Sequence, residues 1–156
     1  MKLIIQVPCF NEEKDILRTL NGLPNSLRDI DEIEVLIIND GSEDNTIKEA
    51  KKYNGHKLNI LNIPVKRGLS NAFTNGINKS LDLGADIIVN TDADNQYDSN
   101  NIQNLIDPIL KKESDIVIGS RDFKKIKNFS KSKNFFQNLG SKVISVISGT
   151  KVVDAT

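Results

Sequence analysis

The sequence contains few residues of the types that build disulfide or zinc sites: one cysteine and one histidine among 156 residues, and no tryptophan. Cys9 alone cannot form an internal disulfide, and with a single histidine it cannot complete a Cys/His zinc site. Lysine plus arginine and aspartate plus glutamate both number 21, so the formal net charge is zero. This balance gives no support to a nucleic-acid-binding surface, and we expect no nucleic-acid partner.

Long apolar runs are also missing. No segment approaches the roughly 20 apolar residues of a membrane-spanning helix, and the few residues before Pro8 are too short for the apolar core of a signal peptide. A cytoplasmic location is therefore expected.

Short apolar, β-branched runs alternate with segments of helical spacing along the chain. The runs predict strands at residues 3–7, 34–38, 58–63, 86–91 and 116–118. The segments between them predict helices at residues 12–20, 45–53, 70–83 and 98–112, with a kink or restart at Pro108, and a last helix whose apolar residues run from 136 to 147. This alternation predicts an α/β fold, a mostly parallel open sheet with helices on both faces, in one domain over residues 1–156.

The fourth predicted strand ends in two carboxylates, Asp92 and Asp94, followed by Gln96. Two aspartates this close repel each other unless a cation lies between them, so a divalent metal with oxygen ligands is the simplest explanation. An EF-hand loop would need a glycine in place of Tyr97 and a glutamate in place of Gln103, which excludes that class of site.

Polar residues also follow the first, second and fifth predicted strands, in segments 8–12, 40–42 and 119–121. Because ligands bind outside the carboxyl ends of parallel strands, we expect these segments to line one crevice. Each has a simpler interpretation when taken alone: residues 39–42 are an ordinary turn sequence, and Asn11 is a suitable helix cap.

The motifs Pro8-x-x-Asn11-Glu12, Asp40-Gly41-Ser42, Lys66-Arg67-Gly68-Leu69, Asp92-Ala93-Asp94-x-Gln96 and Gly119-Ser120-Arg121, in this order, resemble the family 2 glycosyltransferases. Within the family the chain looks most like the dolichyl- and undecaprenyl-phosphate sugar transferases. The resemblance covers nearly the whole chain. It implies the Rossmann-like GT-A fold and the transfer of a sugar from a nucleoside-diphosphate-sugar donor, UDP- or GDP-linked, with inversion at the anomeric carbon.

The resemblance also assigns residues to the nucleoside. Pro8, Asn11 and Glu12 would border it, with Glu12 accepting hydrogen bonds from the ribose hydroxyls. Asp40 would accept a ring N–H of the base. Gly68, which opens the third predicted helix, would let the backbone approach the nucleotide closely.

For the diphosphate, the resemblance implies that Asp92, Asp94 and Gln96 hold Mg²⁺ or Mn²⁺. The metal would offset the negative charge that grows on the leaving nucleotide. Arg121 would contact phosphate oxygens as a second cation, so Asp94 and Arg121 are the expected catalytic residues.

The acceptor is less well defined by the sequence. No persuasive catalytic base is found, although Asp122 and Asp154 are candidates. A polyprenyl-phosphate acceptor would need no base, because a phosphate is already anionic at neutral pH; a cell-envelope glycan is the other acceptor considered. In the resembled branch, the last helix carries an arginine and a Ser-Arg pair that hold phosphate. This chain lacks the Ser-Arg pair in the comparable region, where Lys133 would substitute as a point charge. A lipid acceptor would place the full-length protein at the inner face of the cell membrane.

The chain stops where the resembled enzymes continue, so we expect a fragment that holds the donor-binding half. Two alternatives remain open at this point: a non-catalytic nucleotide-sugar-binding module, and a sugar-1-phosphate nucleotidyltransferase. The second should carry a glycine-rich loop after its first strand, and residues 8–13 contain no glycine.

Overall fold

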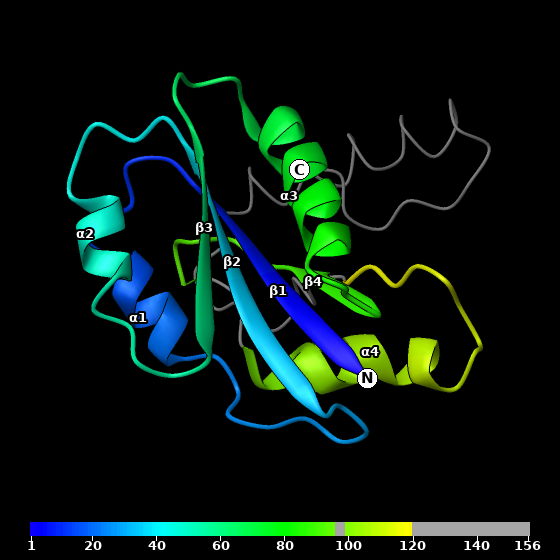
Figure 1. Cartoon of the computed structure of the whole chain (residues 1–156). Helices are drawn as coiled ribbons and strands as arrows, with labels where there is room; N and C mark the ends of the chain where they lie inside the picture. Colours follow the sequence, from blue (N-terminus) through cyan, green and yellow to red (C-terminus); the bar gives the residue numbers. More distant parts are fainter. Residues whose placement is uncertain (96–98, 120–156) are drawn as a thin grey trace, which may run out of the picture. The chain divides into compact units, whose positions relative to one another are not determined.

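Four parallel strands form the central sheet of the computed structural model (Figure 1). The structure describes residues 1–95 and 99–119, and residues 1–115 form one compact unit. The strands are β1 (Lys2–Cys9), β2 (Glu32–Asp40), β3 (Lys57–Ile63) and β4 (Ile87–Asn90), in the spatial order β3-β2-β1-β4. The sheet grows outward from β1 to β3, and the chain then returns to the other side of β1. The strand order therefore reverses between β1 and β4, where open α/β sheets bind ligands.

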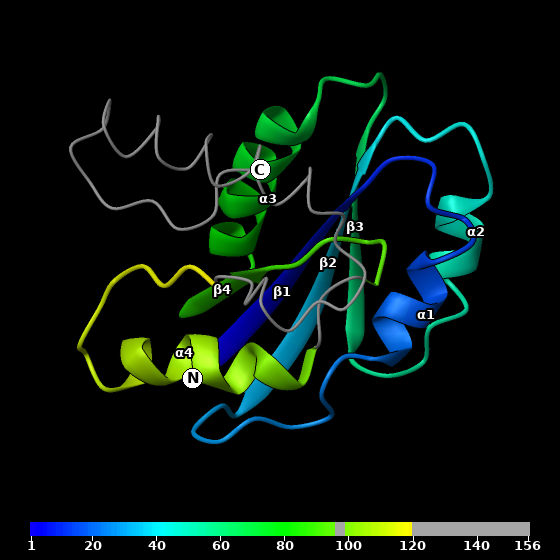
Figure 2. The same ribbon diagram turned by 180° about the vertical axis from the view of Figure 1, so that it is seen from behind.

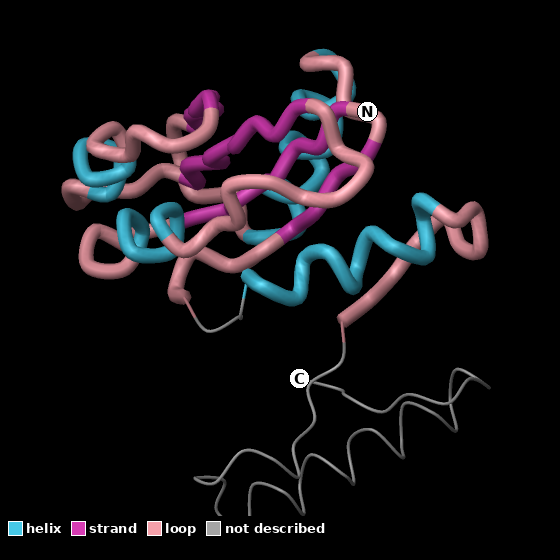
Figure 3. Tube along the Cα trace, turned by 90° about the horizontal axis from the view of Figure 1, so that it is seen from below, coloured by secondary structure: helices cyan, strands magenta, loops and turns pink. Residues whose placement is uncertain are grey.

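Helices cover both faces of the sheet (Figures 2 and 3). They are α1 (Ile16–Asn21), α2 (Thr46–Ala50), α3 (Leu69–Asp82) and α4 (Ile102–Leu110), with a short 3-10 helix, η1 (Ser99–Asn101), before α4. Leu3, Ile5 and Val7 of β1 belong to the core that includes α1, α2 and α4, whereas Ile4 belongs to the core with α3. The predicted α/β sheet with helices on both faces is confirmed for the described residues.

Helix α3 lies close to the sheet because its buried face consists of small residues, Ala72, Gly76 and Ser80. A Cβ atom at position 76 would be 2.5 Å from Oε1 of Gln6 and 3.0 Å from Cδ1 of Ile38. Glycine is therefore required there for the helix to approach β1 and β2.

The first strand extends further than predicted. The sequence suggested an end at Pro8, but β1 continues through Cys9, with Pro8 opposite Ile38 of β2. The pairing of β1 with β4 stops earlier, at Gln6 and Asn90. Beyond Gln6, β1 pairs with β2 alone, so Pro8 has a neighbouring strand on one side only. The N–H that proline lacks therefore removes no hydrogen bond to β4.

The prediction of a fifth strand at residues 116–118 was wrong. These residues have no regular secondary structure, and Ile116 and Ile118 are 81% and 86% exposed. A β-branched run is stable as a strand only when a neighbouring strand and a covering layer accept it. The predictions for Gln96, Arg121, Lys133 and the last helix lie outside the described residues. Within residues 1–95 and 99–119, no helix combines the length and apolarity needed to cross a membrane.

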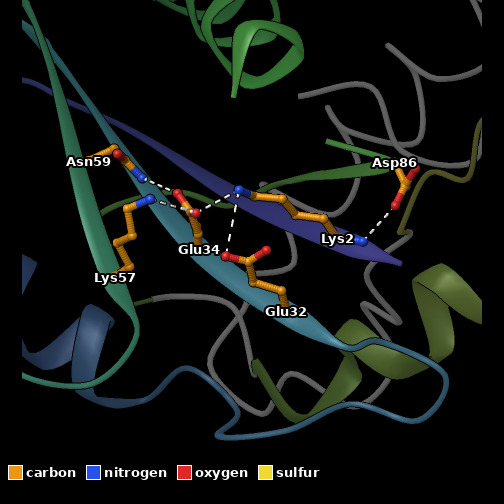
Figure 4. Close-up of polar contacts among 6 residues, drawn as sticks. All are labelled: Lys2, Glu32, Glu34, Lys57, Asn59 and Asp86. Atoms are coloured by element: carbon orange, nitrogen blue, oxygen red, sulfur yellow. Dashed lines mark hydrogen bonds and ion pairs between the residues drawn. The ribbon is translucent and has the colours of Figure 1, made fainter. Parts of the chain in front are cut away.

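A charged cluster lies at the amino ends of the strands (Figure 4). Glu34 of β2 is fully buried and accepts hydrogen bonds from Lys2 Nζ at 2.6 Å, Lys57 Nζ at 3.0 Å and Asn59 Nδ2 at 2.6 Å. Burial opposes ionisation of Glu34, but the three donors outweigh it and lower the pKa of the carboxyl to about 2. The cluster therefore joins the first residues of three strands.

Candidate functional site

A cleft of about 320 Å³ lies at the carboxyl ends of the strands. It is lined by Pro8, Cys9, Phe10, Glu12, Asp40, Lys66, Gly68, Leu69, Ala72, Asp92, Ala93 and Asp94. A larger surface hollow, of about 670 Å³, is lined by α1 and α2 side chains such as Leu17, Arg18 and Glu49 and includes none of the predicted site residues. The cleft at the strand ends is therefore the candidate site.

The loop after β1 and the loop after β2 are joined by reciprocal hydrogen bonds. The N–H of Asn11 donates to Ser42 Oγ at 3.0 Å, and the N–H of Glu43 donates to Asn11 Oδ1 at 2.9 Å. Asn45 donates to Glu13 Oε2 through its backbone N–H and its side-chain amide, both at 3.1 Å. Asn11 has a φ of 57°, a left-handed conformation that asparagine tolerates better than most residues. The side chain of Asn11 thus fixes this loop.

Asp44 and Thr46 also join the same two loops, by accepting backbone hydrogen bonds from the loop after β1. The fully buried hydroxyl of Thr46 donates to Asp44 Oδ1 and accepts the N–H of Glu12 at 2.8 Å. The N–H of Glu13 donates to Asp44 Oδ2 at 3.2 Å. Burial raises the pKa of Asp44, but the bonds from Thr46 and Glu13 outweigh it and hold the pKa below its usual value. An ionised Asp44 therefore fixes the backbone that carries Glu12.

The carboxylates in the cleft act on one another. Burial raises the pKa of Glu12, and the negative charges of Asp94, Asp15, Asp44 and Asp92 raise it further. Glu12 is half-buried in a cleft whose wall also carries Asp40, Asp92 and Asp94. The site therefore favours a cation or a ligand that brings positive charge between these groups.

Asp40 is only 4% exposed, and both of its carboxylate oxygens accept backbone hydrogen bonds. The donors are the N–H of Arg67 at 2.8 Å and the N–H of Gly68 at 2.7 Å. Gly68 precedes α3 with a φ of 90°, a conformation that favours glycine. The predicted position of Gly68 at the start of this helix is confirmed. Asp40 thus holds the segment that closes one side of the cleft.

The cleft wall also carries a positively charged side chain, that of Lys66. The Nζ atom of Lys66 lies 3.6 Å from the centroid of the Phe10 ring. This is a cation–π contact, which keeps the ammonium group over the ring in the cleft wall. A phosphate group in the cleft would have this positive charge within its reach.

Cys9 also lines the cleft, but its surroundings disfavour the thiolate form that a nucleophile requires. The residue is 4% exposed. Burial, and then the charges of Glu12, Asp44 and Asp40, raise the pKa of the thiol to about 12.

The donor set fits a magnesium or manganese ion that is completed by a substrate. No group of three or more histidine, cysteine, aspartate or glutamate side chains converges on one point within residues 1–95 and 99–119. Asp92 and Asp94 offer hard oxygen ligands on the wall of the cleft. Mg²⁺ typically takes one or two protein carboxylates and fills its remaining positions with phosphate oxygens and water, so two carboxylates on the wall of an open cleft suit it.

The structure brings six predicted site residues to one cleft: Pro8, Glu12, Asp40, Gly68, Asp92 and Asp94. Asn11 lies in the adjoining loop. Sequence reasoning missed Phe10 as a partner of Lys66, and it missed Asp44 and Thr46 as anchors. A signal for the last two was present, because an aspartate two residues before a threonine at a helix start is typical of a capping turn.

The sequence is similar to those of known glycosyltransferases. Residues 4–154 match the family described as Glycosyl transferase family 2. A UDP-N-acetylglucosamine–dolichyl-phosphate N-acetylglucosaminyltransferase of Methanococcus voltae is 35% identical over 92% of this chain and 61% of its own length. An undecaprenyl-phosphate mannosyltransferase of Micrococcus luteus is 26% identical over 100% of this chain and 64% of its own length. The chain thus spans less than two thirds of these relatives.

A solved structure supports the fold. Glucosyl-3-phosphoglycerate synthase of Mycobacterium tuberculosis, in complex with Mn²⁺, UDP and glucosyl-3-phosphoglycerate, superposes with a TM-score of 0.54 at 23% identity. The match covers 70% of this chain and 39% of that one.

Proposed function

The chain belongs to the family 2 glycosyltransferases, and from this we propose that it holds the donor site for metal-dependent, inverting transfer of a sugar from a nucleoside-diphosphate-sugar. The observation that supports the proposal most strongly is the cleft at the β1/β4 switch point, which collects Glu12, Asp92 and Asp94 beside Lys66. A cleft with carboxylates for a metal and a cation for phosphate suits a diphosphate ligand.

In this proposal each side of the cleft contacts a different part of the donor. Pro8, Asn11 and Glu12 border the nucleoside, with Glu12 accepting hydrogen bonds from the ribose. Asp40 holds the Arg67–Gly68 backbone, and the remaining lone pairs of its oxygens accept a ring N–H of the base.

Asp92 and Asp94, with Gln96, hold Mg²⁺ or Mn²⁺, which when bound neutralises charge on the diphosphate. From the sequence resemblance alone, we also assign phosphate contacts to Arg121 and Lys133. Asp94 and Arg121 are the proposed catalytic residues. The solved relative that binds Mn²⁺ and UDP supports this choice of ligands.

The acceptor that we propose is a polyprenyl phosphate. Two relatives are named for transfer to dolichyl phosphate and undecaprenyl phosphate. A phosphate acceptor is anionic at neutral pH and can attack without a base. Such an acceptor would place the protein at the inner face of the membrane.

Calorimetric titration tests the donor site directly. We expect UDP or GDP to bind more tightly in the presence of Mn²⁺ than in the presence of EDTA. The phosphate-free nucleoside, uridine or guanosine, is the matched control, because it lacks the diphosphate and should show no metal effect. Nucleotide binding that ignores the metal, or no binding of either nucleotide, would exclude the proposed site.

A further inference from the structure

A threonine of α1 contacts the backbone of the acidic turn. The hydroxyl of Thr19 donates to the carbonyl oxygen of Ala93 at 2.7 Å. Thr19 is 6% exposed and Ala93 is 4% exposed. Because the contact is buried, water cannot replace either partner, and the hydrogen bond fixes the position of the Ala93 peptide group.

This peptide group lies between the two carboxylates of the cleft. Ala93 packs into the core with α1 and α4, whereas Asp92 and Asp94 are half-buried on the cleft wall. Asn95, the next residue, has a φ of 57°. Two neighbouring carboxylates repel each other, so the turn needs an anchor on its buried side to keep both side chains at the cleft.

The bond made by Thr19 differs from the one that a helical threonine usually makes. Such a hydroxyl commonly bonds the carbonyl four residues earlier in its own helix. Thr74 of α3 does this, donating to the carbonyl of Ser70 at 3.0 Å. Thr19 instead donates to a residue 74 positions away in the sequence.

We propose that Thr19 is a positioning residue for the acidic turn, setting the geometry with which Asp92 and Asp94 receive a divalent cation and a diphosphate. The proposal rests on the proposed function for the identity of the ligand. The anchoring itself is a property of this chain without any ligand.

Thr19→Val replaces the hydroxyl by a methyl group of similar size and leaves the Ala93 carbonyl without its donor. In the nucleotide-free protein we expect amide hydrogen exchange at residues 94 and 95 to become about tenfold faster. The affinity for UDP in the presence of Mn²⁺ should fall about tenfold, while the metal-free affinity stays within about twofold. Thr19→Ser keeps the hydroxyl and should restore both values.

The same threonine-to-valine change at two other positions serves as a control. Thr46→Val removes another buried hydroxyl, but one that holds the Glu12 backbone; it should lower the UDP affinity by the same factor with and without Mn²⁺. Thr74→Val removes an exposed bond within α3 and should change neither affinity nor exchange at the acidic turn. If Thr19→Val does not fold, Thr19→Ala tests the same loss.

Unchanged exchange at residues 94 and 95 in folded Thr19→Val would overturn the inference, as would an equal loss of affinity with and without Mn²⁺. If the wild-type chain binds no nucleotide, the proposed function fails. The exchange measurement then still decides whether Thr19 anchors the turn.

Discussion

Two glutamates at opposite ends of the sheet, Glu34 and Glu12, have pKa values shifted in opposite directions. At the amino ends, Glu34 is fully buried, and Lys2, Lys57 and Asn59 lower its pKa to about 2 (Figure 4). At the carboxyl ends, burial and the charges of neighbouring aspartates raise the pKa of Glu12. The same type of group is stabilised as an anion at one end and destabilised as an anion at the other.

This difference separates a structural cluster from a binding site. The amino-end cluster is complete within the chain, since each donor and the acceptor come from neighbouring strands. At the carboxyl ends the protein holds like charges close together, which a cation would relieve. Unfavourable electrostatics retained beside a cleft are typical of functional sites.

The largest expected effect comes from Asp94→Ala. Removing a proposed direct metal ligand should cost at least what removing an outer partner of a ligand costs, so we expect the affinity for UDP in the presence of Mn²⁺ to fall about a hundredfold. Calorimetry with Mn²⁺ and with EDTA measures this. The metal-free affinity should not fall, because Asp94 is assigned to the metal and not to the nucleoside.

Asp82→Ala is the matched control, since Asp82 is an exposed aspartate at the end of α3, away from the cleft lining. A variant without Asp94 that keeps its Mn²⁺-dependent affinity would show that the acidic turn is not the metal site.

The next largest effect is on stability. Glu34→Gln removes the charge that three donors share and leaves the ammonium group of Lys2, which is 19% exposed, without its buried partner. We expect a loss of about 2 kcal/mol in the free energy of unfolding at neutral pH. Most of this loss should come from Lys2 and Asn59, because the solvent exposure of Lys57 weakens its contribution. Urea unfolding measures the loss, and nucleotide affinity should not change. An unchanged midpoint would show that the cluster contributes nothing.

The same substitution has a defined pH dependence. A carboxyl whose folded pKa is about 2, against an ordinary value of 4.5, contributes stability that is present above pH 4.5. This contribution is lost as the pH falls from 4.5 towards 2. The stability difference between wild type and Glu34→Gln should therefore shrink over that range, and a constant difference would contradict the depressed pKa.

The sequence was sufficient for most of the fold. Apolar runs such as residues 35–38 are recognised as buried strands because both faces of a parallel strand are covered, so no alternation with polar residues interrupts them. The same pattern failed at Ile116–Ile118, since a run of three residues does not reveal whether a neighbouring strand accepts it. The extent of β1 past Pro8 depended on where β4 stops, which is a tertiary fact.

For the site, the sequence predicted the residues that line the cleft better than the residues that hold them in place. Glu12, Asp92 and Asp94 follow strands directly, and the carboxyl-end rule brings them together. The partners of Thr19 and Thr46 are far away in the sequence or hidden in a turn, and a threonine in a helix has an ordinary local role. Positioning residues of this kind become visible only when the loops are placed in space.

The smallest expected effect has the opposite sign from that of Glu34→Gln. Because the pKa of Glu12 is raised above its ordinary 4.5 in the folded protein, the folded state binds this proton more tightly than the unfolded state. The contribution of Glu12 to stability is therefore largest below pH 4.5 and is lost as the pH rises through the raised pKa. Glu12→Gln avoids this loss and should stabilise the nucleotide-free chain at pH 7 by about half a kcal/mol, while its affinity for UDP falls.

Urea unfolding of the nucleotide-free protein at pH 7 and at pH 4 tests this, with the stabilisation expected only at the higher pH. Saturating Mn²⁺ and UDP should reverse the order of the two proteins, because the stability added by a bound ligand grows with the logarithm of its affinity and the wild type binds more tightly. If Glu12→Gln were instead destabilising at pH 7, the crowded carboxylates would stabilise the fold as the Glu34 cluster does. The charged groups at both ends of the sheet would then stabilise the fold, although the residues at the two ends differ.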